Sequence, residues 1–332
     1  MPGAISRRDF ARQPFAATPP TPSDYWLRIY RRAMACRFEV TLAGEHADWV
    51  PAARAALDAV DAIESQLTVF RDSSEVVTLN RTAAAGPVPI DRDLFALVQL
   101  CQQLHGDTDR AFDVTSTPLS RCWGFLRRAG RLPAAEEIAS VMNTVGMHHV
   151  VTAPDARTIA FDCADLELNF GAIGKGWALD RIAGRLVADG VTHALLSAGR
   201  SSVKAIGGPW PIALTSPQLD RPMAQLTLRA GALGTSGAGE QFFEVEGTRY
   251  GHVIDPRTGW PARGALSVSV ITDDAAHADA LSTAFFVGGL DLARSYCRTH
   301  ADVLVVFTPD DEARRPVVIG GYSDAHVEVA SC

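Results

Sequence analysis

Two oxygen-bearing side chains, Asp279 and Thr283, lie four residues apart in a stretch whose apolar spacing predicts a helix over residues 274–289. Positions four apart project from the same face of a helix. A carboxylate and a hydroxyl are hard oxygen ligands that suit Mg²⁺ better than zinc. The spacing alone leaves a structural alternative open, in which Asp279 caps the helix or forms an ion pair and Thr283 bonds back to its own backbone.

A glycine-rich stretch, "FGAIGKGWALD", opens another predicted helix and places Lys175 in the turn. Backbone amides at a helix N-terminus together with a lysine can bind an anion. The stretch is not a phosphate-binding P-loop, because Lys175 is followed by Gly176 rather than by Ser or Thr. An ordinary tight turn remains the alternative.

Three further stretches carry polar groups in flexible surroundings. "GALGTSGAGE" contains Thr235 and Ser236, and "AFDVTSTPLSRCWGF" contains Asp113. "HVIDPRTGWP" is a proline- and glycine-rich turn that begins with His252. Taken alone, each fits a structural role as well as a chemical one.

The elements that must position these residues are helices and strands in irregular alternation. Apolar spacing, Gly and Pro signals predict helices over residues 48–70, 73–81, 91–106, 130–149, 176–191, 274–289 and 290–300. Strands are predicted over 37–44, in a hairpin over 150–162, over 192–199, in several stretches between 203 and 272, and over 301–310. Because the regular alternation of parallel-sheet proteins is missing, the prediction is an α+β fold with mixed or antiparallel sheets packed against helices.

Length and composition predict a globular protein. The chain has 332 residues, 47% of them hydrophobic, and a net charge of -7. The negative charge argues against nucleic acid as a partner, and no apolar run is long enough to span a membrane. We expect a single domain over residues 26–332, made of one unit or two intimate subdomains, after a flexible leader over residues 1–25.

The cysteines and the leader bear on the compartment. Six cysteines include no C-x-x-C pair and no cluster with histidine at zinc spacing, which favours free thiols in a reducing compartment. The leader contains "SRRDF", which is similar to the start of a twin-arginine export signal, but no apolar segment follows it. We therefore expect a cytoplasmic protein, with periplasmic export left open.

The order of these stretches resembles the ApbE family of FAD:protein FMN transferases. The resemblance covers about residues 30 to 310 and rests on "MACRF", "SSEVVTLN", "FDVTSTPLSRCWGF", "LNFGAIGKGWALD", "ALGTSGAGEQF", "HVIDPRTGWP" and "ADALSTAFFVGG". It implies an ApbE-like, T-fold-related architecture. It also implies Mg²⁺-dependent transfer of FMN from FAD to a threonine hydroxyl in a flavinylation motif of a target protein, with release of AMP.

The resemblance implies roles for particular residues. The metal ligands would be Asp279, Thr283 and the backbone carbonyl of Ala172. His252 would be the general base or would orient the acceptor hydroxyl, a task that its ordinary pKa near neutrality suits, and Asp279 would be the second catalytic residue. The positions that match FAD contacts are Met34, Phe70, Ala111, Phe112, Asp113, Asn169, Lys175 and Ile254.

The chain departs from the family pattern at several of these positions. Asn169 stands where an aspartate is usual, and Phe70 stands where a tyrosine is usual. Ala35 replaces the usual glycine after methionine, and Arg200 and Ser201 replace a glycine and a polar residue. Arg200 either adds a phosphate contact or obstructs its turn.

Two alternatives to the transferase remain open at this point. The first is a pyrophosphatase that hydrolyses FAD to FMN and AMP, and the second is a non-catalytic FAD-binding protein. A flavin oxidoreductase is disfavoured because no G-x-G-x-x-G motif follows a strand.

Overall fold

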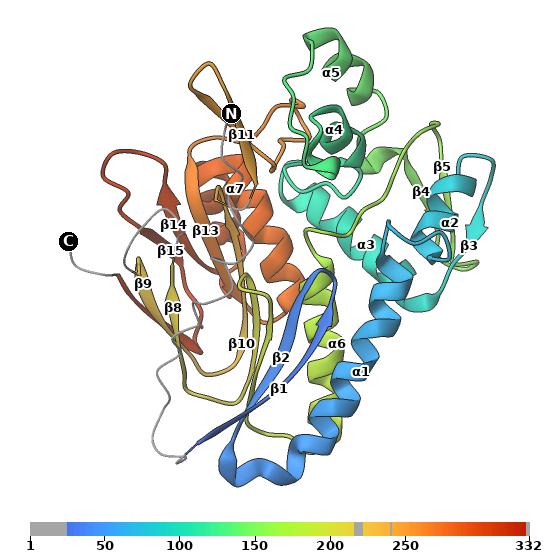
Figure 1. Cartoon of the computed structure of the whole chain (residues 1–332). Coiled ribbons are helices and arrows are strands. Elements are labelled where there is room, and N and C mark those ends of the chain that lie inside the picture. The colour runs from blue at the N-terminus through green and yellow to red at the C-terminus, as the bar shows by residue number, and fades with distance from the viewer. Residues whose placement is uncertain (1–24, 216–221, 240, 330–332) are drawn as a thin grey trace.

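An eight-stranded antiparallel sheet forms the centre of the molecule (Figure 1). The computed structural model describes residues 25–215, 222–239 and 241–329, so nearly all of the predicted leader, including its "SRRDF" stretch, lies outside the described residues. In spatial order the strands of the sheet are β1 (Trp26–Ala33), β2 (Cys36–Ala43), β6 (Ala194–Ala198), β7 (Ser202–Ile206), β10 (Gly231–Gly237), β13 (Ala265–Thr272), β14 (Leu304–Pro309) and β15 (Val317–Gly320).

Three smaller sheets accompany the central one. They are formed by β16 (Ala325–Val329), β9 (Ala224–Leu228) and β8 (Trp210–Leu214), by β3 (Val88–Pro89), β5 (Thr158–Phe161) and β4 (Val150–Ala153), and by the hairpin β11 (Phe242–Val245) and β12 (Thr248–Gly251). Every pairing between these named strands is antiparallel. The predicted α+β class is therefore confirmed.

Helices cover one face of the central sheet, and the sheet of β8, β9 and β16 covers the other (Figure 1). The helices are α1 (Val50–Leu67), α2 (Glu75–Thr82), α3 (Arg92–Asp107), α4 (Thr117–Cys122), α5 (Ala135–Met142), α6 (Gly174–Ala188) and α7 (Ala275–Thr299). Strand β13 is buried along its whole length, as its unbroken apolar and small-residue run requires for a strand covered on both faces.

Most predicted elements are present with shifted ends. The two helices predicted over 274–289 and 290–300 form the single element α7, which is interrupted at Gly289, where φ is 76°. The helix predicted over 130–149 is wrong in extent, because α5 ends at Met142 and a separate 3-10 turn, η4, spans Met147–His149. The Thr144 hydroxyl donates to Val141 O and so satisfies a carbonyl that a longer helix would have used.

The sequence patterns missed β1, α4 and the C-terminal strands β15 and β16. Strand β1 pairs with β2 from Trp26 to Ala33, although charged residues interrupt its alternation. Helix α4 is only six residues long and belongs to a small hydrophobic cluster of its own around Trp123. Short or polar elements such as these depend on tertiary packing more than on local pattern.

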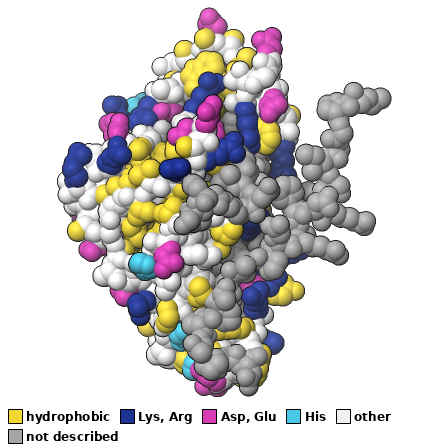
Figure 2. Space-filling view, turned by 90° about the vertical axis from the view of Figure 1, so that its left-hand side faces the viewer, with side chains coloured by type: hydrophobic (Ala, Val, Ile, Leu, Met, Phe, Trp, Pro, Cys, Tyr) yellow, Lys and Arg dark blue, Asp and Glu magenta, His cyan; other side chains and the backbone are white. Residues whose placement is uncertain are grey.

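Hydrophobic side chains are exposed on part of the molecular surface. Figure 2 shows hydrophobic side chains gathered beside Lys and Arg side chains on one face, and on edge strand β15 Val318 is exposed. The five cysteines among the described residues are all free, and Cys101 and Cys122 are buried. Within the described ranges no helix has the length and apolar character of a membrane span.

Candidate active site

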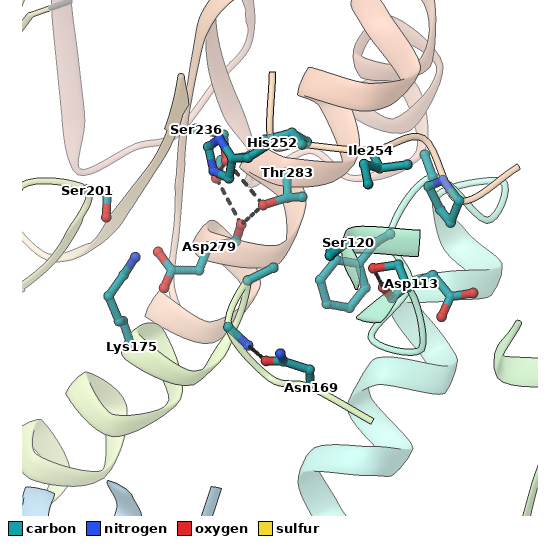
Figure 3. A pocket seen from close by; sticks show the side chains of 18 of the residues that line it. Asp113, Ser120, Asn169, Lys175, Ser201, Ser236, His252, Ile254, Asp279 and Thr283 are labelled. Atoms are coloured by element: carbon teal, nitrogen blue, oxygen red, sulfur yellow. Dashed lines mark hydrogen bonds between the residues drawn. The ribbon is translucent and has the colours of Figure 1, made fainter. Parts of the chain in front are cut away.

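Ten of the twelve predicted site residues line one cavity of about 350 Å³. It lies where the start of α6, the end of β10, the first half of α7, the turn after β12 and the loop before α4 meet (Figure 3). The ten are Ala111, Phe112, Asp113, Asn169, Ala172, Lys175, His252, Ile254, Asp279 and Thr283. Stretches separated by more than a hundred residues are thus brought together as the sequence analysis predicted.

Asp279 is held at the floor of the cavity by two hydrogen bonds. Its Oδ2 accepts from the backbone amide of Gly176 at 2.8 Å, and its Oδ1 accepts from Ser202 Oγ at 2.7 Å. Burial raises the pKa of this carboxyl to about 6, and the nearby Lys175 ammonium opposes that rise. Each carboxylate oxygen has two lone pairs, so each can still accept one more partner from the cavity side.

A cluster of hydroxyls lies beside Asp279. Ser236 Oγ on β10 is 2.9 Å from Ser282 Oγ and 3.1 Å from Thr283 Oγ1 on α7. The hydroxyls of Ser282 and Thr283 also donate to the backbone carbonyl of Asp279, at 2.8 and 3.3 Å. The backbonding that the sequence left open for Thr283 is therefore present, but the same hydroxyl lines the cavity.

Ala172 lies on the turn that enters α6, and Lys175 lies in the first turn of that helix. Asn169 Oδ1 accepts from the amide of Gly171 at 2.9 Å, which closes the turn, and α6 begins at Gly174. Figure 3 shows Lys175 and Asp279 facing the same part of the cavity. The cavity is therefore lined at one place by the Asp279 carboxylate, the turn at Ala172 and the Lys175 ammonium group, and Asn169 lines it nearby.

Gly176 lets α6 approach α7 closely enough to hold Asp279. A Cβ at Gly176 would lie 2.0 Å from the backbone oxygen of Ala275, whereas a Cβ at Gly184 on the same helix would meet nothing within 4 Å. We expect Gly176→Ala to lower the free energy of unfolding by at least about 1 to 3 kcal/mol, because backbone must move. Gly184→Ala should raise it by about 0.5 to 1 kcal/mol, because it removes a helix-interior glycine. Urea unfolding of both variants checks this, and equal effects would contradict it.

Asp113 shapes the wall of the cavity through hydrogen bonds within the protein. Its side chain is almost fully buried, and its Oδ1 accepts from the backbone amide and the hydroxyl of Thr115, at 2.8 and 2.6 Å. Its Oδ2 lies 3.2 Å from His105 Nδ1 and 3.3 Å from the amide of Met147. The carboxylate therefore fixes the loop before α4.

His252 begins the turn that closes the cavity on the side of β12. Its Nδ1 lies 3.2 Å from the carbonyl oxygen of Gln241, and because a carbonyl can only accept, Nδ1 carries the proton in this bond. In the neutral ring the lone pair is then on Nε2. Asp255 holds the turn by accepting from the Arg257 amide and guanidinium.

The same turn is anchored to the cluster around α4. Trp123 Nε1 donates to the carbonyl of Gly259 at 2.8 Å, and Gly259 has a φ of 76°. A Cβ at Gly259 would lie 2.4 Å from the side chain of Ile138. The glycine and the tryptophan thus fix the position from which His252 reaches the cavity.

Met34 and Phe70 lie in a second cavity, of about 440 Å³, that adjoins the first. The two cavities share Asn169, Gly171 and Lys175 in their linings. Phe70 is 80% exposed, so its ring is available to an arriving ligand. The predicted site residues therefore form two connected groups.

Ala35 sits in a strained position in the turn between β1 and β2. Met34 and Ala35 have φ values of 48° and 56°, and the pairing of Ala33 with Cys36 makes this a two-residue hairpin turn, which favours glycine. We expect Ala35→Gly to raise the free energy of unfolding by about 1 kcal/mol. Ala52→Gly in α1 is the matched control and should lower it by about as much. Urea unfolding decides, and a destabilised Ala35→Gly variant would show that the turn is unstrained.

The departures at Arg200 and Ser201 leave the turn between β6 and β7 intact. Gly199 adopts a φ of 63°, and Ala198 pairs with Ser202 across the turn. Arg200 is exposed and does not line the described cavity, whereas Ser201 does. The obstruction considered for Arg200 therefore does not occur.

Sequence reasoning missed Ser202, Gly176 and Ser236 as parts of the site. Ser202 and Gly176 bind the Asp279 carboxylate, and Ser236 was noted only as a hydroxyl in a flexible turn. Their roles depend on the packing of β7, α6 and β10 against α7. Of the three, only Ser202 had a signal in the sequence, because strand alternation places its side chain on the face of the sheet that the helices cover.

Comparison with known proteins gives consistent matches. Residues 34–307 match the model of the ApbE family. A FAD:protein FMN transferase of Vibrio cholerae is 29% identical over 76% of this chain and 78% of its own, and one of Klebsiella pneumoniae is 30% identical over 74% and 78%. The crystal structure of the ApbE protein of Thermotoga maritima, 28% identical, superposes with a TM-score of 0.79 and covers 89% of this chain and 97% of its own.

Proposed function

Because the chain belongs to the ApbE family, it is an enzyme that transfers FMN from FAD to a target protein, and we propose that the acceptor is a threonine hydroxyl and that Mg²⁺ assists the reaction. The transferase activity is the one named for its curated relatives. The threonine, the metal and the individual residue roles are our proposals. We also propose that residues 26–332 form one domain, because one hydrophobic cluster joins residues from Leu67 to Phe307.

The observation that carries the proposal is the meeting of oxygen donors and a cation at the floor of the first cavity. Asp279, Thr283 and the turn at Ala172 offer a carboxylate, a hydroxyl and a carbonyl, a donor set that suits Mg²⁺. When bound, Mg²⁺ would offset negative charge on the pyrophosphate. Lys175, in the first turn of α6, adds a second positive charge for that group.

The two connected cavities support binding of an extended ligand such as FAD. Asn169 and Lys175 line both, so a pyrophosphate there would direct the two halves of FAD to either side. We assign Met34 and Phe70 to FAD from the second cavity. From the first cavity we assign Ala111, Phe112, Asp113 and Ile254.

In the proposed reaction the threonine oxygen attacks the phosphorus that carries the riboflavin half. A new bond between that oxygen and phosphorus forms, the bond from this phosphorus to the bridging oxygen breaks, and AMP leaves with the bridging oxygen. His252 Nε2 takes the proton of the threonine hydroxyl. The hydrogen bond from Nδ1 to Gln241 supports this role, because it places the lone pair on Nε2.

Acid should weaken Mg²⁺ activation through Asp279. The pKa of this buried carboxyl is raised to about 6, so the ionised form that binds a cation dominates above that pH and is lost as the pH falls through it. Below about pH 6 we expect the Mg²⁺ concentration for half-maximal AMP release to rise by up to about tenfold per pH unit. Mg²⁺ titrations at pH values on both sides of 6 measure this. A requirement that stays constant into the acid range would contradict it.

The decisive experiment is a turnover assay with purified protein, FAD and a target domain that carries a threonine flavinylation motif, with and without Mg²⁺. We expect AMP release and a fluorescent target on a denaturing gel, both dependent on Mg²⁺, and no labelling when the motif threonine is replaced by alanine. Release of FMN and AMP without labelling would replace the transferase with a pyrophosphatase. Stoichiometric FAD that survives incubation with Mg²⁺ would indicate a non-catalytic binder.

A further inference from the structure

Three side chains of different chemistry converge at one end of the β4–β5 hairpin, outside both cavities. One ligand atom from each of His149, Asp162 and Cys163 lies within 4.8 Å of the other two. His149 Nδ1 is 2.5 Å from Asp162 Oδ1. The sequence shows no histidine and cysteine at zinc spacing because these residues flank two strands, His149 before β4 and Asp162 and Cys163 after β5, so the cluster appears only in the fold.

The backbone holds these positions in place independently of any ion. Val150 pairs with Phe161, and the amide of Asp162 donates to the carbonyl of His149 at 3.1 Å, which extends the ladder by one pair. The side chains of such cross-strand neighbours lie close together on one face. The amide of Phe161 also donates to Ala83 O at 2.9 Å, which ties the hairpin to α2.

We propose that His149, Asp162 and Cys163 bind one zinc ion, with a fourth coordination position open to water. An imidazole nitrogen and a thiolate are donors that favour zinc over Mg²⁺, and three protein ligands with one open position is a common zinc arrangement. Zinc binds such donors at about 2.0 to 2.3 Å, so the donor atoms of one tetrahedral site lie about 3.3 to 3.8 Å apart. His149 Nδ1 and Asp162 Oδ1, which are 2.5 Å apart, would therefore separate by about 1 Å through side-chain rotation to admit the ion. His149 and Cys163 are half-buried and Asp162 is exposed, so an ion reaches the site from solvent.

This site is connected to the wall of the first cavity through the turn η4. His149 ends η4, the amide of Met147 in the same turn donates to Asp113 Oδ2 at 3.3 Å, and the amide of Gly146 donates to Thr115 Oγ1 at 2.7 Å. A zinc ion on His149 would therefore stabilise the turn that holds the Asp113 loop. In this proposal the ion stabilises the fold, water fills its fourth position, and it takes no part in FMN transfer.

The test is direct metal binding by the full chain, stripped of metal and free of FAD. With Mg²⁺ in excess, calorimetric titration with Zn²⁺ should give one equivalent bound and a raised midpoint of thermal unfolding. Titration with Co²⁺ should give a thiolate-to-cobalt charge-transfer absorption band. Because FAD and acceptor are absent, the outcome is independent of the proposed transferase chemistry.

Variants assign the ligands. Cys163→Ser should abolish the cobalt band and weaken zinc binding by more than about tenfold. Even residues that only hydrogen-bond to a zinc ligand typically change the metal affinity by about 10 to 100-fold when they are replaced. His149→Ala should weaken zinc binding similarly. Cys297→Ser is the matched control, because Cys297 is another half-buried thiol, which donates to the carbonyl of Val303. It should bind zinc as the parent chain does.

Three results would overturn the proposal: no zinc bound by the folded parent chain, full zinc affinity in Cys163→Ser, or full zinc affinity in His149→Ala. If a variant fails to fold, the parent chain and the cobalt band still decide the outcome. A cobalt complex without the thiolate band would exclude Cys163 as a ligand.

Discussion

Replacing Asp279 with alanine should abolish Mg²⁺-dependent AMP release while much of the affinity for FAD remains. Asp279 is the only carboxylate we assign to the metal, and it lies buried between Gly176 and Ser202 at the cavity floor. Its loss removes both the negative charge that attracts the ion and one of three proposed ligands. We expect the rate of AMP release to fall by about 10³-fold or more, which corresponds to about 4 kcal/mol of transition-state stabilisation.

Two controls separate loss of the metal from loss of structure. Asp279→Asn keeps the volume; its oxygen can accept from the Gly176 amide while its NH₂ group donates to Ser202 Oγ, so it should fold like the parent chain and lose activity like the alanine variant. Asp291→Ala removes an exposed carboxylate from the same helix and should leave turnover unchanged. FAD affinity is measured by quenching of flavin fluorescence. Turnover that persists in Asp279→Ala would remove Asp279 from the metal site.

A smaller effect is expected at Ser202. Ser202→Ala deletes one of the two hydrogen bonds that orient the Asp279 carboxylate but leaves the charge in place. Activity should then fall by about 10 to 100-fold, in keeping with a hydrogen bond to a charged group worth about 1.5 to 3 kcal/mol. A requirement for more Mg²⁺, rather than a change in FAD affinity, would identify Ser202 as a positioning residue.

The helices of this protein could be predicted where apolar spacing and caps agree. Residues 50–67 and 92–107 form helices close to the predicted limits, with Pro51 in the first turn of one and Asp91 capping the other. Strand β13 was found because its run of apolar and small residues, typical of a strand buried on both faces, is unbroken. By contrast, β1 carries three arginines and was missed, because its place in the sheet is set by pairing with β2 rather than by its own pattern.

The site shows the same division between local pattern and tertiary packing. Asp279 and Thr283 were found because helical spacing puts both on one face, and the resemblance to a family supplied the partners on other elements. Ser202 could not be found in this way, because its hydroxyl reaches Asp279 only once β7 and α7 have packed together. The group of His149 and Cys163 was missed for the same reason, since two strands and a register are needed to bring it together.

Replacing His252 with alanine should slow transfer to the acceptor much more than it weakens FAD binding. The Nδ1 hydrogen bond to the Gln241 carbonyl fixes the ring and leaves Nε2 as the basic nitrogen, at the rim of the cavity that contains Asp279. General-base catalysis typically contributes about 10² to 10⁴-fold, so we expect a loss of this size in the rate of target labelling. The fluorescence of the labelled target, followed over time at saturating FAD, measures this rate.

The control variants and the pH dependence distinguish a base from a binding group. His252→Gln keeps a polar side chain of similar reach but cannot take a proton, so it should be as slow as the alanine variant, whereas His326→Ala, at an exposed position on β16, should be unaffected. Added imidazole should restore part of the rate in His252→Ala, because it can enter the vacated space and take the proton. The acidic limb of the rate profile that reflects the histidine should disappear in both His252 variants. Equal losses of FAD affinity and transfer rate, without imidazole rescue, would instead assign His252 to binding, and the proton of the acceptor hydroxyl would then need another base among the groups that line this cavity.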